Sequence, residues 1–212
     1  MSLSNQHLSA NSYWNKTFSR ISALDDQMGR CITDYCQNHR PEPELVGWII
    51  DRLRGDEKVD FSTKPEIQII IESLQQNHAY YRDQALPEIG QSFSHLAKSK
   101  PESLYIGLCE KLFDLYATSL IEHINEEEIL FGRILNSDQA ELTAGHFSHV
   151  EHSDESQALD EITEVLHSTA DPKTFDPGNI LLVQLKNLSN DLKIHTFIEE
   201  QLLHPILDRE NH

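Results

Sequence analysis

The sequence predicts an all-α protein, and more specifically an antiparallel up-down four-helix bundle preceded by a small helical region. Three observations lead to this fold class. The 212 residues contain only eight Gly and little alternation of apolar and polar side chains, so strands are not favoured. Four long segments carry apolar residues at helical spacing. The links between these segments are short, which favours antiparallel neighbours.

The first and second bundle helices are predicted at residues 64–99 and 100–135. Pro87 lacks an N–H, so it should kink or interrupt the first of them. Ser99 and Glu102 have the spacing of a capping box, and Pro101 lies between them. We therefore expect the second helix to begin close to Ser99.

The third and fourth bundle helices are predicted at about residues 144–168 and 179–209. The segment between them is rich in Asp and Pro, which are turn residues. Within it, Asp176 is a candidate N-cap before Pro177. Together the four helices place the bundle at residues 63–210.

Residues 1–60 are predicted to form a separate small region, which is also helical in pattern. Such a short segment buries little apolar surface by itself. A charged stretch at residues 54–65 links it to the bundle. We therefore expect two parts, residues 1–60 and residues 63–210, and an apolar face on the first part makes a homodimer a candidate assembly.

The charge of the chain disfavours some classes of partner. The formal net charge is −18, with 35 acidic and 17 basic residues, whereas nucleic acids and anionic membrane surfaces bind basic patches. No apolar run is long enough to span a membrane, and the first residues lack the apolar core of a signal peptide. Three Cys do not suggest a disulfide framework. We expect a cytoplasmic protein without nucleic-acid or membrane partners.

One frame of residues occurs twice, 72 positions apart. HINEEEILFGRIL begins at His123 and HTFIEEQLLHPIL begins at His195, and each has Glu four and five residues after the His. Residues four apart share a helix face, so Glu127 lies beside His123 and Glu199 lies beside His195. A single pair of this kind is usually a solvated contact. The repetition within the same apolar pattern indicates instead that both pairs face inward.

Two inward-facing carboxylates need a cation or hydrogen-bonded partners. His78 in the first helix and His152 in the third fall at about the same depth as the repeated pairs, counted from the connecting turns. One His from each helix with two Glu suits a pair of metal ions bridged by carboxylates, and this ligand type favours iron or manganese. The predicted ligands are His78, His123, Glu127, His152, His195 and Glu199.

Other histidines fit this site less well. His149 lies one turn before His152 and is a candidate seventh ligand. His95 would lie about 26 Å from His78 along a continuous helix, so we expect it on the surface. His167 is also too far from the common depth, and His39 belongs to the N-terminal part.

Taken together, these motifs resemble those of the hemerythrin-like domain, whose frame is H…HxxxE…H…HxxxE. The closer likeness is to the iron–sulfur cluster repair di-iron proteins, and it covers about residues 65–208. HAYYRDQALPEIG, HINEEEILF, VEHSDESQALDEI and HTFIEEQLLHPIL are similar to the four motifs of that group. The resemblance implies two iron ions in an oxo- and carboxylate-bridged centre, with the six residues above as ligands and Glu127 and Glu199 as the bridges.

The resemblance also implies a function. It predicts a cytoplasmic stress-response protein that responds to nitric oxide or oxidative stress and helps to repair damaged iron–sulfur clusters. Its partners would be O2, NO and iron–sulfur proteins. An alternative is a hemerythrin-like module that binds or senses O2 or NO without turnover, so whether the chain is an enzyme stays open. A metal-free helical interaction protein is disfavoured, because few Lys and Arg lie near enough to pair with the inward carboxylates.

The N-terminal cysteines depart from this group. Its short N-terminal domain typically carries a Cys-Cys pair after Asp-Tyr, whereas here Gln37 follows Cys36. Cys31 and Cys109 are expected to be structural. A reactive Cys36 thiol with a low pKa would favour redox or repair chemistry, and an inert thiol would favour a binding module.

Overall fold

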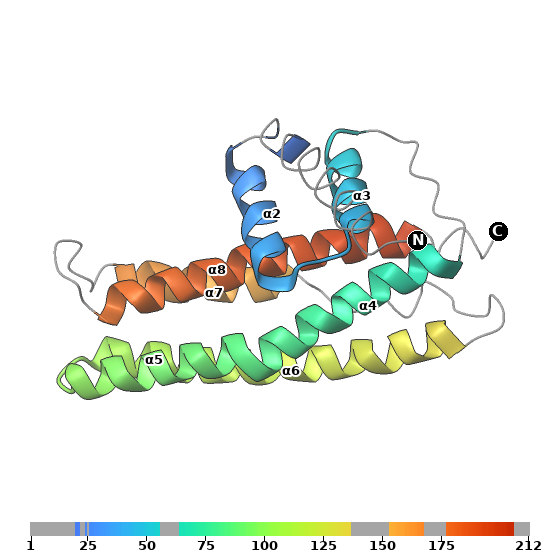
Figure 1. Ribbon diagram of the computed structural model, residues 1–212. Helices are drawn as coiled ribbons and strands as arrows, with labels where there is room; N and C mark the ends of the chain where they lie inside the picture. The colour runs from blue at the N-terminus through green and yellow to red at the C-terminus, as the bar shows by residue number, and fades with distance from the viewer. Residues whose placement is uncertain are drawn as a thin grey trace, which may run out of the picture.

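The residues that the computed structural model describes form helices and short connections, with no strand among them (Figure 1). This confirms the all-α class for that part of the chain. The description covers residues 20–21, 24, 26–55, 64–136, 153–167 and 177–205, without the side chains of 26, 27, 64 and 153–157.

In the described part of the chain, the shorter helices α2 and α3 precede the long ones. α2 spans Asp26–His39 and α3 spans Pro43–Leu53. Pro43 stands in the first turn of α3, where a missing N–H costs no helical hydrogen bond. Arg40 has a φ of 49° in the tight connection between the two helices. Both helices lie on the same side of the long helices (Figure 1). There α2 contacts α8 (Pro177–Ile198), and α3 contacts the π-helical segment η3 (Glu199–Leu203).

The first long helix contains the interruption expected at Pro87. Its α-helical pattern is broken by a π-helical segment, so that the three parts are α4 at Lys64–Tyr80, η1 at Tyr81–Ala85 and α5 at Leu86–Ser99. The Leu86 N–H bonds to the Tyr81 carbonyl, five residues back. The next residue, Pro87, has no N–H to donate, and the wider turn accommodates this loss without ending the helix.

The second long helix, α6, spans Leu104–Asn136. Its 33 residues give it a length of about 50 Å. The predicted start near Ser99 is wrong. Ser99 instead ends α5, where its hydroxyl donates a hydrogen bond of 2.8 Å to the Leu96 carbonyl. Residues 100–103 form the turn, so Pro101 belongs to the connection and not to the helix.

The last two long helices are α7 at Ser153–His167 and α8 at Pro177–Ile198, and a second π-helical segment, η3, follows at Glu199–Leu203. Pro177 is the first helical residue of α8, whereas its candidate N-cap, Asp176, lies outside the described residues. η3 ends two residues before Pro205, just as η1 ends two residues before Pro87. The chain therefore contains the same local irregularity in two different long helices.

The long helices pack side by side. α5 contacts both α6 and α8, and α7 also contacts both of them. α6 and α8 run in one direction and α4–α5 runs in the other (Figure 1). The assignment of these helices to an up-down four-helix bundle stays a prediction.

Two clusters of buried apolar side chains form the core. One joins α2 and α3 to α4, the second half of α6, the end of α8 and η3. The other lies between η1, α5, α6 as far as Ile124, α7, and α8 as far as Leu192. The N-terminal helices thus share a core with the long helices, and the predicted boundary near residue 60 stays a prediction.

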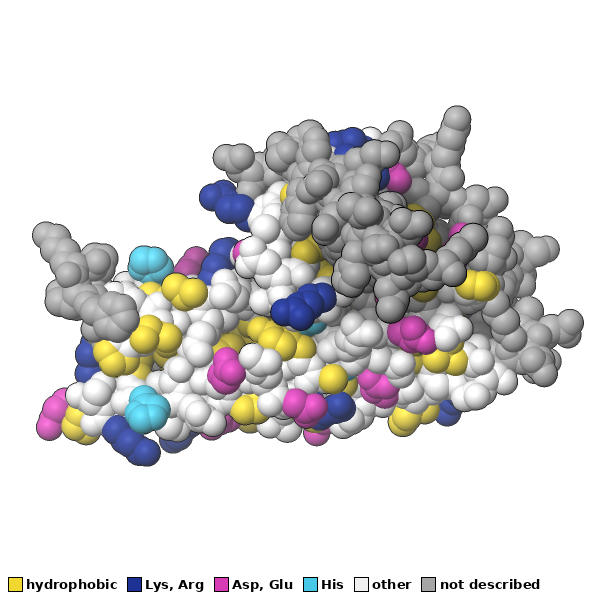
Figure 2. Space-filling view, in the orientation of Figure 1, with side chains coloured by type: hydrophobic (Ala, Val, Ile, Leu, Met, Phe, Trp, Pro, Cys, Tyr) yellow, Lys and Arg dark blue, Asp and Glu magenta, His cyan; other side chains and the backbone are white. Residues whose placement is uncertain are grey.

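Charged side chains of both signs lie on the surface of the described residues. On the face shown in Figure 2, Lys and Arg side chains are scattered among the acidic ones. Within the described residues, no helix combines the length and the apolar character that a membrane span requires.

Candidate metal centre

Four buried side chains from three long helical segments meet at the border between the two apolar clusters. His78 lies near the end of α4, Glu127 in α6, His195 near the end of α8 and Glu199 at the start of η3. One ligand atom of each residue lies within 4.8 Å of those of the other three. Because none of these side chains is more than 5% exposed, the group is shielded from water.

Glu127 lies at the centre of this group. Its Oε1 is 2.9 Å from Nε2 of His123, which is one turn earlier in α6 and is also buried. Its Oε2 is 3.1 Å from Nε2 of His78 and 3.9 Å from Nε2 of His195. Three imidazoles from three helices therefore face one carboxylate, which is a position from which a carboxylate can bridge two ions.

The second His–Glu pair has the same geometry. His195 Nε2 lies 3.1 Å from Glu199 Oε1, one helical turn away. The imidazoles of His78 and His195 come from α4 and α8, and their ring centroids are 5.0 Å apart. The structure thus brings five of the six predicted ligand residues into one place: His78, His123, Glu127, His195 and Glu199.

The two π-helical segments flank the ligands. η1 begins three residues after His78, and η3 begins at Glu199 itself. A π turn adds one residue to the helical repeat. The side chains after it are therefore rotated, so different residues point to the inside of the protein. These segments were not predicted from the sequence. Pro87 and Pro205, each two residues beyond a π segment, were the signal in the sequence.

The His78 ring is held in place through its second nitrogen, Nδ1, and through one of its faces. Its Nδ1 lies 2.9 Å from Oε1 of Glu128, and Oε2 of that carboxylate accepts a hydrogen bond of 2.8 Å from Gln75 Nε2. Phe131 stacks on the same ring at 5.6 Å with an interplanar angle of 9°. A carboxylate that accepts from Nδ1–H fixes the tautomer whose Nε2 is free to bind metal.

Burial and charge shift the proton affinities of the group. Burial alone would raise the pKa of Glu127, but the imidazoles of His123, His195 and His78 lower it well below its ordinary value. Burial raises the pKa of Glu199 to about 7 despite the opposing effect of His195. Burial alone would lower the pKa of His195, but Glu199 and Glu127 raise it to about 10. In the metal-free protein, protons on His195 and Glu199 therefore offset the negative charge of the two carboxylates. Metal binding would release these protons.

The donor atoms fit a metal ion. His78 Nε2 and Glu127 Oε2 are buried 3.1 Å apart, yet neither atom makes a hydrogen bond within the described part of the chain. Buried polar atoms are normally hydrogen-bonded, so this pair needs an explanation. A cation between them would satisfy both lone pairs. Imidazole and carboxylate are together a ligand set for iron, manganese or zinc, whereas Mg²⁺ and Ca²⁺ take oxygen ligands.

Four other histidines named in the sequence analysis lie on the surface or outside the described residues. The predicted ligand His152 and the candidate seventh ligand His149 lie outside the described residues, and α7 begins one residue after His152. His95 is exposed, which confirms the expectation that it lies on the surface. His167 is exposed at the end of α7.

His39 is a buried histidine whose partner was not predicted from the sequence. Its Nε2 lies 2.5 Å from Oδ2 of Asp191, and both side chains are 1% exposed. The contact joins α2 to α8, one turn before His195. Nothing in the local sequence signals a pairing across 152 positions.

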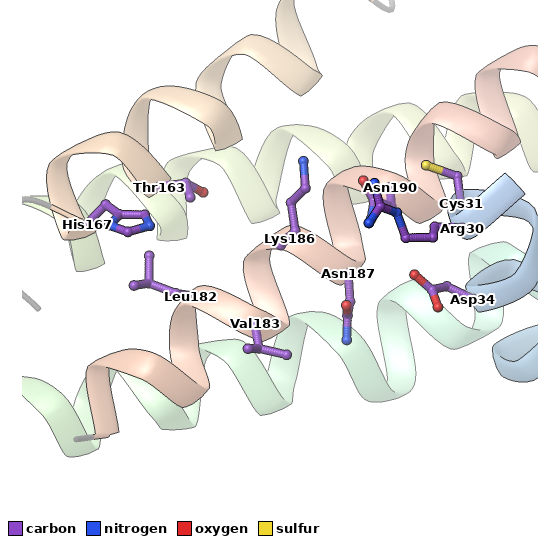
Figure 3. A pocket seen from close by; sticks show the side chains of 10 residues that line it. All are labelled: Arg30, Cys31, Asp34, Thr163, His167, Leu182, Val183, Lys186, Asn187 and Asn190. Atoms are coloured by element: carbon purple, nitrogen blue, oxygen red, sulfur yellow. The ribbon is translucent and has the colours of Figure 1, made fainter. Parts of the chain in front are cut away.

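The three cysteines are buried and form no disulfide. Cys31 and Cys109 belong to the two apolar clusters, as expected for structural residues. Cys31 also lines one end of an open pocket of about 720 Å³ between α2, α7 and α8 (Figure 3). Cys36 is 8% exposed, and burial raises the pKa of its thiol to about 12. A thiol with such a pKa is not a nucleophile at neutral pH.

Comparisons with known proteins give no relative from which to transfer a function. The chain matches no family model, no curated protein and no solved structure. The buried histidines and glutamates are therefore the observation that bears on function.

Proposed function

We propose that the chain is a di-iron protein built on an up-down four-helix bundle of the hemerythrin type. The four members of the bundle would be α4–α5, α6, α7 with the residues before it, and α8 with η3. The residues that would hold the two iron ions are His78, His123, Glu127, His152, His195 and Glu199.

The buried group of His78, Glu127, His195 and Glu199 is the observation that carries this proposal. Two carboxylates this deep in an apolar core are costly unless a cation or protons balance their charge. Two ions with six protein ligands would keep open coordination positions. Iron bound there would supply a redox-active centre accessible to diatomic molecules such as O2 and NO.

The chain's own residues would hold and shield that centre. Glu127 faces three imidazoles and is the best placed of the two glutamates to bridge. Phe131 covers one face of the His78 ring, and the Tyr81 ring packs edge-on against His195 at 5.6 Å. These aromatic side chains exclude water from the ligands.

For this centre we propose a role in the repair of iron–sulfur clusters damaged by nitric oxide or oxidative stress. The proposal rests on the resemblance of the four motifs, and the buried His and Glu group supports the metal part of it. Because the Cys36 thiol is buried with a pKa raised to about 12, such repair would run through iron and not through this thiol.

The state of Cys36 also favours a second candidate function. An inert thiol is the property expected of a hemerythrin-like module that binds or senses O2 or NO without turnover. Reactivation of a nitric-oxide-damaged [4Fe–4S] protein separates the two candidates. Recovery of cluster absorbance on addition of the iron-loaded chain would support repair, and reversible NO binding without such recovery would support the binding module.

Iron content tests the metal proposal. Protein purified without oxygen should contain two iron ions per chain, and Glu127→Ala should lower this content. Glu126→Ala is the matched control, because Glu126 is the adjacent residue of the same helix and is exposed. Equal iron content in the wild type and both variants would remove the site assignment.

A further inference from the structure

The N-terminal helix α2 contacts both of the helices that carry His78 and His195. Tyr35 and His39 are one turn apart in α2, so their side chains leave the same face of the helix. Tyr35 reaches α4, and His39 reaches α8 at Asp191. The helix therefore braces two of the elements that position the metal ligands.

Tyr35 contacts α4 through its hydroxyl group. The side chain is fully buried, and its oxygen lies 3.1 Å from Oγ of Ser73. The same hydroxyl lies 3.3 Å from Oδ1 and 3.1 Å from Nδ2 of Asn77. Tyr35 thus fixes the position of a buried amide that directly precedes the ligand His78.

Asn77 carries this contact on to the metal centre. Its side chain is fully buried, and its Nδ2 lies 3.3 Å from Nδ1 of His195. The two ends of the amide are interchangeable by a half-turn, so the amide can also present its oxygen to an Nδ1–H. Since Nε2 of His195 faces Glu199 and Glu127, Nδ1 is the atom left to orient the ring.

The contact between His39 and Asp191 strengthens the same arrangement. Asp191 lies one turn before His195 on α8, and its Oδ2 is 2.5 Å from His39 Nε2. A displacement of α2 would therefore disturb both the Asn77 amide and the turn of α8 that carries His195.

We propose that Tyr35 and Asn77 are positioning residues of the metal centre, through which helix α2 orients the imidazole of His195. This inference rests on the proposed function, because it concerns a ligand of the proposed di-iron site. Partners of the second ring nitrogen of a metal-bound His typically contribute 10–100-fold to metal affinity. On this account α2 is part of the metal centre, although it supplies no ligand.

The test is the affinity for Fe²⁺, measured without oxygen by competition with a chromophoric chelator. Asn77→Ala should weaken binding about 10–100-fold, and Tyr35→Phe about tenfold. The double variant should bind as Asn77→Ala does, because Tyr35 acts through Asn77 and the two effects are not independent. Tyr116→Phe is the matched control, since it removes a buried hydroxyl from the other apolar cluster.

Circular dichroism and the thermal midpoint of the metal-free variants separate positioning from folding. A purely structural role would lower the midpoint and leave the Fe²⁺ affinity of the folded protein unchanged, which would overturn the inference. Additive losses in the double variant would also overturn it. If Tyr35→Phe does not fold, the Fe²⁺ affinity of Asn77→Ala is the deciding measurement. An Asn77→Ala variant that binds Fe²⁺ as tightly as the wild type would refute the proposal. A wild-type chain that binds no Fe²⁺ would instead refute the proposed function, and this inference with it.

Discussion

Replacement of Glu127 by Ala should lower iron content and stability together. In the wild type this carboxylate lies 2.9 Å from His123 Nε2 and 3.1 Å from His78 Nε2, at a site where it is 3% exposed. Its removal leaves buried imidazoles facing an empty space. Because an imidazole can release its proton and so leave no unpaired buried charge, we expect the cost to be that of unsatisfied polar groups, about 1–3 kcal/mol in the metal-free protein.

The iron-loaded protein should lose more. A ligand that binds only the folded state at 100 times its Kd stabilises it by about 2.7 kcal/mol. If Glu127→Ala abolishes binding, this contribution disappears as well, so the total loss becomes about 4–6 kcal/mol. The loss should therefore depend on iron, which an ordinary core substitution does not show.

Urea unfolding without oxygen, with and without a chelator, measures both parts. Glu126→Ala should change the free energy of unfolding by no more than about 0.5 kcal/mol under either condition, because Glu126 is exposed. A Glu127→Ala variant that unfolds like the wild type in both conditions would refute the reasoning. So would a loss of the same size with and without iron.

Three further predictions follow from the site and from its surroundings. Glu199→Ala should lower the iron content, measured by mass spectrometry of digested protein. Glu200→Ala, which changes an exposed neighbour, should leave it unchanged. Equal losses in the two variants would mean that iron content depends on surface charge and not on Glu199 as a ligand. His152→Ala should lower iron content more than His149→Ala, and the opposite order would make His149 the ligand. Burial raises the pKa of Cys36 from 9.0 to about 12, so the folded state favours the protonated thiol, and the resulting stability is present below pH 9 and lost as pH rises toward 12. The wild type should therefore lose stability faster than Cys36→Ala between pH 9 and 12, by up to about 1.4 kcal/mol per pH unit, and parallel curves would contradict this.

The sequence was sufficient where the site depends on local spacing. His123 with Glu127 and His195 with Glu199 are four apart on helices, and helical geometry alone places each pair on one face. Pro87 likewise predicted the interruption of its helix, because proline has no N–H. His78 was predicted to lie at the same depth as the two repeated pairs by counting residues from the turns that connect antiparallel helices.

The sequence was insufficient where partners are distant in the chain or where two patterns compete. Ser99 and Glu102 have the spacing of an N-terminal cap, yet Ser99 bonds backward to Leu96 and ends the preceding helix. The pairing of His39 with Asp191 and the contact of Tyr35 with Asn77 join helices that no local pattern relates. The π-helical segments were missed because periodicity analysis assumes a constant helical repeat.

Anomalous X-ray diffraction at the iron absorption edge, from crystals of protein purified without oxygen, tests the central claim most directly. We expect two iron peaks among the six proposed ligands, which are His78, His123, Glu127, His152, His195 and Glu199. An anomalous map without a peak between these side chains, or with iron bound only at the surface, would contradict it.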